Sequence, residues 1–279
     1  MNHSQPLFSI DPMNVYYNLD GLTDVILTCD VDWAPDFAIE AVYRMIAAFH
    51  FKLTIFATHR SDLLQRPPEF VEVGLHPDFT RQPPTGSFRE KVANLLEYYP
   101  GSRGMRAHRN FFGQNISDIA WELGLTYDAS IFLWNRSHCQ CYIDYNGLLK
   151  YCYLWEDGIH LDTRTPLRVS EINLLSPGMK ILNIHPILFY LNAPTDDYRR
   201  EVTRKYRDLT AAPQSAIDPE IYRGRGIRTF YQEILTFLKE SQVRTHRLGD
   251  LTERLARSGY SKRPQIEPLA ITPEADQHA

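Results

Sequence analysis

The stretch Ile26-Leu27-Thr28-Cys29-Asp30-Val31-Asp32 joins an apolar run to a pair of carboxylates. The run predicts a buried β-strand over 25–30. Asp30 and Asp32 have the same parity, so on a strand both side chains point to one side. Two carboxylates that close repel each other unless a cation or a shared proton lies between them. In barrels and open α/β sheets the active site lies at the carboxyl ends of the strands, so the pair predicts a functional site there.

A short polar loop and a helix follow this strand. The alternative interpretation of the two carboxylates is that they belong to the loop and carry no chemistry. We expect Asp36 to be the N-cap of the helix, because the apolar residues after it fall on one helical face: Ile39, Val42, Ile46 and Phe49.

Strand and helix patterns alternate along the rest of the chain. Apolar runs predict further strands at 53–57, 71–75, 104–108, 125–128, 179–184 and 243–248. One-sided apolar patterns predict helices near 89–98, up to 123 and over 227–238, and a last helix that starts at Asp250 and ends at Gly259. We expect Ser117 to cap the helix that Gly124 ends. The alternation predicts a parallel α/β architecture.

Length and composition suit one sizeable domain. The chain has 279 residues, of which 43% are hydrophobic, and a single barrel often reaches about 200–250 residues. We expect one catalytic domain over 1–260 with a charged helical excursion near 195–223. The tail at 261–279 has too few apolar residues to order itself.

Net charge, cysteine spacing and the lack of targeting signals indicate which classes of protein this chain does not resemble. The net charge is −4 without a basic face, which argues against a main role in nucleic-acid binding. The four cysteines are expected to be reduced thiols, because the Cys139-Gln140-Cys141 spacing lacks the second pair of a structural zinc site. The N-terminus shows no signal peptide, and no apolar stretch reaches the length of a membrane-spanning helix. We therefore expect a cytoplasmic protein with no membrane span.

Histidines gather at the ends of the predicted strands. His59, His76, His108 and His185 each follow such a strand or end it, as the carboxylates do. Taken singly, each histidine has a structural interpretation; His76 and His185, for example, precede prolines that end their strands. Taken together, carboxylate oxygens and imidazole nitrogens form the ligand set of a catalytic zinc, or a similar divalent metal, with an open position.

Five short blocks of the chain resemble the polysaccharide deacetylase (NodB-homology) family, and most closely its WbmS-like branch. In chain order the blocks are Leu27-Thr28-Cys29-Asp30-Val31-Asp32, Glu72-Val73-Gly74-Leu75-His76-Pro77, Gly104-Met105-Arg106-Ala107-His108, Trp155-Glu156-Asp157 and Leu182-Asn183-Ile184-His185-Pro186. The similarity covers residues 25–192 and continues more weakly over 226–248. It implies a distorted (β/α) barrel of about seven strands and a metal-dependent carbohydrate N-deacetylase.

The resemblance also implies roles for individual residues. Asp30 matches the catalytic base of the family, and Asp32 and His76 match two metal ligands. Arg106 matches the arginine that orients the base. His185 matches the histidine of the last motif, which is the general acid.

Two positions stay less determined by the resemblance. The acidic residue that orients His185 falls at Glu156 or Asp157, and we expect Asp157. The family's second metal histidine lies four residues after the first, where this chain has Thr80. We predict that His108 supplies the missing ligand from the neighbouring strand end. The alternative is that His108 only forms hydrogen bonds in the wall of the cleft.

These roles predict a hydrolase that removes an acetyl group from the nitrogen of an amino sugar, with a divalent metal, zinc by preference, as cofactor. A cytoplasmic location would suit a lipid-linked or nucleotide-linked amino sugar as substrate. Two alternatives stay open: a metal-independent amidohydrolase on the same fold, and a carbohydrate-binding pseudoenzyme that has lost the metal. The missing second histidine favours the pseudoenzyme, whereas the retained base and acid favour the enzyme.

Overall fold

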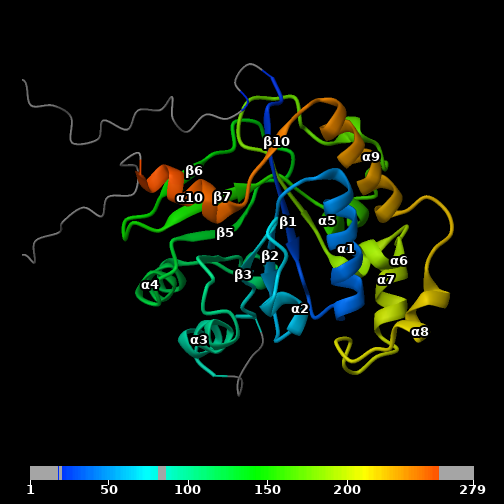
Figure 1. The fold of residues 1–279 in the computed structure, drawn as a ribbon, viewed down its shortest axis with the longest axis horizontal. Helices are drawn as coiled ribbons and strands as arrows, with labels where there is room; N and C mark the ends of the chain where they lie inside the picture. Colours follow the sequence, from blue (N-terminus) through cyan, green and yellow to red (C-terminus); the bar gives the residue numbers. More distant parts are fainter. Residues whose placement is uncertain (1–17, 19–20, 81–85, 258–279) are drawn as a thin grey trace, which may run out of the picture.

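A ten-stranded sheet forms the centre of the molecule (Figure 1). The computed structural model describes Asn18 and residues 21–80 and 86–257. Within these residues the strand order is β6-β7-β5-β4-β3-β2-β1-β9-β8, with β10 paired to β1, and every pairing is parallel except that of β6 with β7. The strands are β1 (Asp24–Asp30), β2 (Leu53–Ala57), β3 (Val71–Leu75), β4 (Gly104–Met105), β5 (Tyr127–Phe132), β6 (Cys141–Ile143), β7 (Leu149–Tyr153), β8 (Trp155–Glu156), β9 (Ile181–Ile184) and β10 (Arg244–Thr245).

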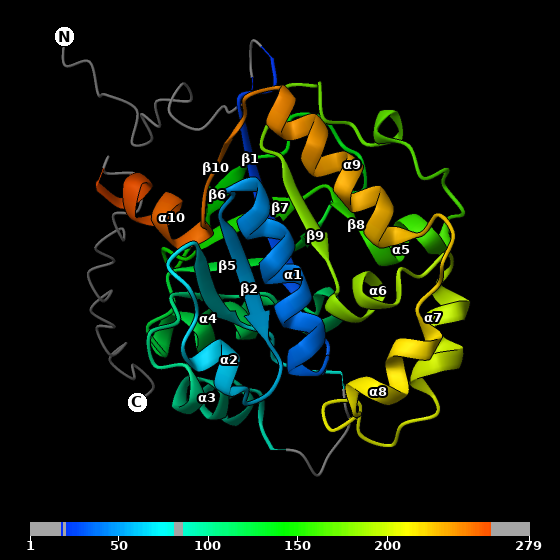
Figure 2. The same cartoon turned by 45° about the vertical axis from the view of Figure 1, so that its right-hand side comes forward.

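Helices cover the outer face of this sheet. Figure 2 shows α1, α6 and α9 in front of β1, β2 and β9, and these three helices pack against one another. α3 packs against α4 and against β3. The α-helices are α1 (Asp36–Phe49), α2 (Asp62–Gln65), α3 (Phe88–Tyr98), α4 (Gln114–Glu122), α5 (Asp157–Asp162), α6 (Pro186–Leu191), α7 (Asp196–Thr203), α8 (Gln214–Ile217), α9 (Ile227–Glu240) and α10 (Leu248–Arg257).

The segment 149–156 contributes to both ends of the sheet. Its first part, β7, pairs with β5, and its last part, β8, pairs with β9. Leu154 lies between the two parts and donates its backbone N–H to the carbonyl of Ile181 at 3.1 Å. The sheet therefore curls toward a barrel, although no strand ladder closes it within the described residues. This arrangement confirms the predicted α/β class and distorted barrel.

The alternating direction of side chains along β1 determines which residues face the interior of the curled sheet. Leu27 and Cys29 belong to the apolar layer between the sheet and the helices. Ile26 belongs to a second apolar cluster, which draws residues from β2, β5, β7 and β9 and so fills the inside of the curl. All seven residues of β1 are buried because both faces of the strand are covered. Asp30 shares the parity of Ile26, so its carboxylate points inward at the carboxyl end of the strand.

The start of α10 closes the opposite end of the curl. The backbone N–H of Leu248 donates to Thr54 Oγ1 at 2.9 Å, and the N–H of Gly249 donates to Glu72 Oε2 at 2.7 Å. The Tyr127 hydroxyl donates to the other oxygen of Glu72 at 3.1 Å. These bonds satisfy backbone donors that the first turn of a helix leaves without partners. The strands are thus held at their amino ends and leave their carboxyl ends open.

Two predicted helix caps are wrong. α1 begins at Asp36 itself, with Pro35 at the N-cap position, and Asp36 Oδ1 accepts a hydrogen bond from Ser61 Oγ at 2.6 Å. Ser117 lies inside α4, where its hydroxyl donates to Asp144 Oδ2 at 2.6 Å. In both cases a partner distant in sequence takes the polar group that a local pattern assigns to the helix end.

Some other helices and strands match their predicted boundaries, and others differ from them. β2 and β3 match the prediction, but β4 ends at Met105 and is followed by a 3₁₀ turn at His108–Asn110. β10 has only two residues, where 243–248 is predicted. Gly124 ends α4 as predicted, with a φ of 84°. The predicted end of the last helix at Gly259 and the tail at 261–279 lie outside the described residues.

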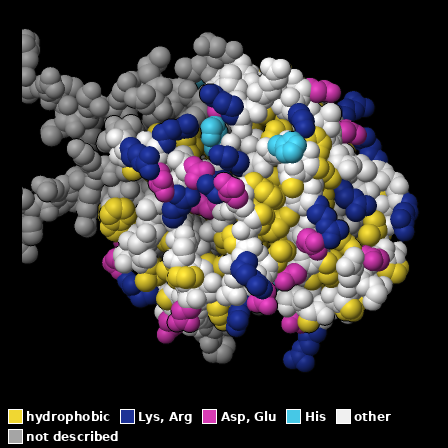
Figure 3. All heavy atoms as spheres, in the orientation of Figure 1, with side chains coloured by type: hydrophobic (Ala, Val, Ile, Leu, Met, Phe, Trp, Pro, Cys, Tyr) yellow, Lys and Arg dark blue, Asp and Glu magenta, His cyan; other side chains and the backbone are white. Residues whose placement is uncertain are grey.

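The surface shows no large area of one charge on the face in Figure 3. Lys and Arg side chains are interspersed there with Asp and Glu side chains. None of the helices within the described residues combines the length and the hydrophobicity that crossing a bilayer requires.

We predict that Gly104→Ala lowers the free energy of unfolding by about 1–3 kcal/mol, as overpacked cores do. A Cβ at Gly104 would lie 2.3 Å from the ring of Tyr127, which is fully buried and held by Glu72. Gly101→Ala is the matched control, because its Cβ would meet nothing within 4 Å. Denaturant unfolding of both variants checks this, and equal stability of the two would contradict it.

Candidate active site and metal centre

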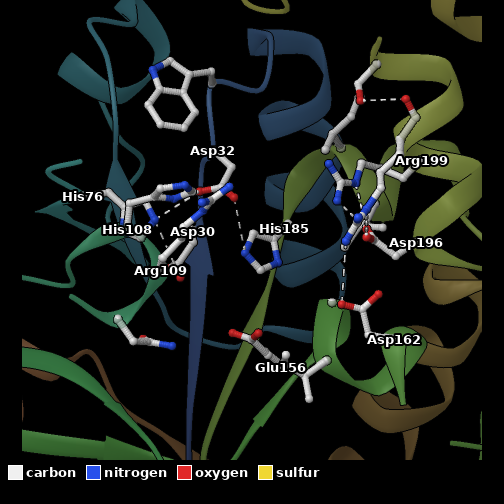
Figure 4. A pocket seen from close by; sticks show the side chains of 18 of the residues that line it. Asp30, Asp32, His76, His108, Arg109, Glu156, Asp162, His185, Asp196 and Arg199 are labelled. Carbon is white, nitrogen blue, oxygen red and sulfur yellow. Dashed lines mark hydrogen bonds and ion pairs between the residues drawn. The ribbon is translucent and has the colours of Figure 1, made fainter. Parts of the chain in front are cut away.

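A cavity of about 580 Å³ opens at the carboxyl ends of the strands (Figure 4). Five of the predicted site residues line it: Asp30, Asp32, His76, His108 and His185. The other two, Arg106 and Asp157, lie behind its wall and bind Asp30 and His185. His59 does not line it; its ring contacts the Thr58 hydroxyl instead. The structure therefore brings all seven predicted residues together.

Asp32, His76 and His108 form a group that could hold a metal. Asp32 Oδ1 lies 3.1 Å from His76 Nε2 and 3.1 Å from His108 Nδ1. One donor atom from each of the three residues lies within 4.8 Å of the others. Thr80, which stands where the family has a histidine, donates its hydroxyl to Asp78 Oδ1 at 2.7 Å.

The chemistry of this group fits a cation. His76 Nδ1 donates to the carbonyl of Arg106 at 2.6 Å, so a neutral His76 would turn the bare lone pair of Nε2 toward a carboxylate. A second proton or a metal between them removes that repulsion, and a backbone carbonyl on the other nitrogen is the usual support of a metal-binding histidine. Burial raises the pKa of Asp32, but the hydrogen bonds from His108 and His76 outweigh it and hold that pKa well below its ordinary value.

The chain adopts strained backbone conformations on both sides of the group. Asp32 and Trp33 have φ angles of 45° and 58°, and Arg109 and Asn110 have φ angles of 55° and 54°. The left-handed conformation costs about 1–2 kcal/mol at Trp33 and Arg109, whereas Asp and Asn adopt it more readily. Strain of this kind gathers at functional sites. The ring of Trp33 lies edge-on to His108 in this region, with centroids 5.1 Å apart.

Asp30 is held by buried polar groups from other strands. Arg106 Nη1 donates to Asp30 Oδ1 at 3.0 Å, and Asn183 Nδ2 donates to Asp30 Oδ2 at 2.9 Å. Arg106 Nη1 also lies 2.9 Å from Thr28 Oγ1 and 2.6 Å from Asn183 Oδ1. Both oxygens of the carboxylate therefore accept hydrogen bonds, which fix its direction.

The sequence interpretation missed Thr28 and Asn183 as parts of this network. Each lies two residues before a predicted site residue, Asp30 on β1 and His185 after β9. A polar residue at that spacing within an apolar strand points to the same side as the site residue. This alternation is the signal that could have found them.

His185 is oriented by Asp157. Its Nδ1 lies 2.6 Å from Asp157 Oδ1, and its backbone N–H donates to Asp157 Oδ2 at 2.8 Å. Burial lowers the pKa of His185, but the charge of Asp157 outweighs it and raises that pKa well above its ordinary value. Nε2 of the ring lies 3.7 Å from Asp32 Oδ2, on the cavity side.

Glu156 has a different environment from Asp157. Its Oε2 accepts a hydrogen bond from the Tyr153 hydroxyl at 3.0 Å, and its side chain lines the cavity (Figure 4). Burial raises the pKa of Glu156 to about 6. Of the two neighbouring acids, Asp157 contacts the His185 ring and Glu156 faces the cavity.

Comparison with known proteins finds solved structures with a similar fold. A candidate polysaccharide deacetylase involved in O-antigen biosynthesis from Bordetella bronchiseptica is 26% identical, with a TM-score of 0.67 over 76% of this chain and 90% of that chain. A candidate polysaccharide deacetylase from Mycobacterium smegmatis shares the fold at 14% identity, with a TM-score of 0.50 over 90% of this chain and 96% of that one. No curated protein matches the chain.

The sequence profile of the WbmS-like polysaccharide deacetylases matches residues 27–202, which is more than half of the chain. That range contains every residue of the predicted site. The chain belongs to the WbmS-like family of polysaccharide deacetylases.

Proposed function

We propose that this chain is a metal-dependent hydrolase that removes an acetyl group from the nitrogen of an amino sugar. One observation carries the proposal. The three residues that could hold a metal lie in one cavity with a carboxylate held by an arginine, Asp30–Arg106, and an imidazole held by a carboxylate, His185–Asp157. Membership in a family of polysaccharide deacetylases supports the carbohydrate substrate.

Asp32, His76 and His108 are the residues that would hold the metal, and zinc is the ion that we propose. Two imidazole nitrogens and one carboxylate oxygen are a usual ligand set for catalytic zinc, which keeps a fourth position open. A divalent cation held there would polarise the acyl carbonyl and lower the pKa of water from about 15.7 toward about 7.

Asp30 is the proposed general base. Its carboxylate lines the cavity, and Arg106 and Asn183 bind both of its oxygens. These bonds fix the direction of the carboxylate, so that it accepts the proton of the attacking water. Base catalysis of this kind contributes about 10²–10⁴-fold to a rate.

His185 is the proposed general acid. Asp157 holds the Nδ1 side of the ring, which leaves Nε2 on the cavity side to donate a proton to the leaving nitrogen. Burial lowers the pKa of His185, but Asp157 raises it well above its ordinary value, which favours the protonated ring that a general acid needs. A protonated donor is needed, because an amine without that proton is a poor leaving group.

The substrate that we propose is a lipid-linked or nucleotide-linked amino sugar, and the proposed location is the cytoplasm. A carbohydrate-binding pseudoenzyme and a metal-independent amidohydrolase are the rival functions. The pseudoenzyme would not need a base and an acid held as Asp30 and His185 are held.

We predict that His108→Ala weakens zinc affinity by more than the ~10–100-fold that loss of an outer-shell partner costs. Thr80→Ala is the control, and we expect it to leave the affinity unchanged, because Thr80 is bonded to Asp78. Calorimetric zinc titration of the metal-free protein checks the affinity, and acetate release from N-acetylated sugars checks the activity. Unchanged zinc affinity in His108→Ala would remove His108 from the ligand set, and acetate release without any metal would favour the metal-independent alternative.

We predict that Asp157→Asn moves the alkaline limb of the rate profile to lower pH. The charge of Asp157 raises the pKa of His185, so removing it lowers that pKa, and the ring loses its proton at a lower pH. Glu156→Gln removes an equal charge without a hydrogen bond to the ring, and we expect a smaller shift. The measurement is kcat against pH for the three proteins. An alkaline limb that stays in place in Asp157→Asn would contradict the role of His185.

A further inference from the structure

The far wall of the cavity carries charged residues that the proposed chemistry does not use. Arg199, Arg200 and Asp196 of α7 line this wall, and Asp162 at the end of α5 lies beside them (Figure 4). They line the same cavity of about 580 Å³ as the proposed metal ligands Asp32, His76 and His108. α7 comes from the charged stretch 195–223, to which the sequence interpretation assigned no site residue.

Asp196 holds the two arginines in fixed positions. Its side chain is only 6% exposed, and its Oδ1 accepts from Arg199 Nε at 2.9 Å and from Arg199 Nη2 at 2.5 Å. Its Oδ2 accepts from Arg200 Nε at 2.5 Å. A buried carboxylate with bonds to both guanidinium groups restricts their rotation, so less conformational entropy is lost when they bind a ligand.

The pair keeps binding capacity toward the cavity. A guanidinium offers five N–H donors, and Asp196 uses two of Arg199 and one of Arg200. Asp162 lies 3.9 Å from Arg200 Nη2, which is beyond hydrogen-bond distance, and about half of each of these two side chains is exposed. A pair that served only to hold α7 would have no need to line the cavity.

We propose, on the basis of the deacetylase function above, that Arg199 and Arg200 bind a phosphate group of the substrate. The planar fork of arginine matches two oxygens of a phosphate. The substrate would then be an amino sugar with a phosphate ester or pyrophosphate, whose acetylated nitrogen lies at Asp30 and His185 while its phosphate lies at α7. The cavity volume suits one such small molecule, since ligand pockets of about 300–1,000 Å³ enclose molecules of that size.

Binding to the metal-free protein tests the proposal without any need for turnover. Three probes are titrated by calorimetry: UDP-N-acetylglucosamine, farnesyl-pyrophosphoryl-N-acetylglucosamine and the neutral chitotetraose. We expect Arg200→Gln to weaken binding of at least one phosphorylated probe about 10-fold or more, as loss of a charge-assisted hydrogen bond does, and to leave chitotetraose binding unchanged. The phosphorylated probe that binds more tightly to the wild type tells a nucleotide source from a lipid source.

Arg207→Gln is the matched control. Arg207 is an exposed arginine of the same stretch that does not line the cavity, so this variant removes the same charge elsewhere. Arg199→Lys is the second variant; it retains a positive charge near Asp196 but loses the fork, and we expect it to weaken the same probe. Thermal unfolding of each variant verifies that α7 stays folded.

The outcomes separate this proposal from the proposed function. Equal weakening of a phosphorylated probe by Arg200→Gln and Arg207→Gln, or equal weakening of all three probes by Arg200→Gln, would overturn the phosphate site. So would wild-type protein that binds chitotetraose more tightly than either phosphorylated probe. Acetate release from chitotetraose, together with binding of the phosphorylated probes that Arg200→Gln does not weaken, would retain the deacetylase function and reject the site. Arg200-dependent binding of a phosphorylated probe without acetate release would retain the site and reject the function.

Discussion

A buried ion pair between Arg106 and Asp30 lies at the centre of the curled sheet and links its strands. The guanidinium is fully buried, and Asp30 is its carboxylate partner at 3.0 Å. A buried charge without a partner is costly, and removing one partner of such a pair typically costs about 3–5 kcal/mol. Polar groups and aromatic rings from several strands surround this cation in the curled sheet. The groups that do so are Thr28 and Asp30 of β1, Phe56 of β2, Ala129 of β5, Tyr153 of β7 and Asn183 of β9.

The same contacts that support the curl also prepare the site. Arg106 binds Asp30 with its side chain and His76 with its backbone carbonyl, so one residue positions both the proposed base and a proposed metal ligand. Asn183 lies two residues before His185 on the neighbouring strand, and it holds the other oxygen of Asp30. Packing of the sheet and orientation of the site thus rest on one set of interactions.

Much of the fold follows from the sequence because the strands are buried on both faces. The runs at β1, β2, β3 and β9 are nearly continuous apolar stretches, and parallel strands bring their carboxyl ends together. Features that rest on distant partners could not be predicted. Ser117 bonds to Asp144 rather than to its own helix end, and His108 reaches Asp32 from a 3₁₀ turn rather than from a strand. Arg199 and Arg200 line the cavity because α7 packs beside α5, and no local sequence pattern specifies this packing.

In the proposed mechanism Asp30 acts as a base held by Arg106 and does not bind the metal. The most direct measurement compares acetate release and zinc affinity in the wild type and in Asp30→Asn, with circular dichroism to verify folding. We expect kcat to fall by about 10²–10⁴-fold while zinc affinity stays close to that of the wild type. Undiminished hydrolysis, or loss of zinc binding in a folded Asp30→Asn protein, would contradict it.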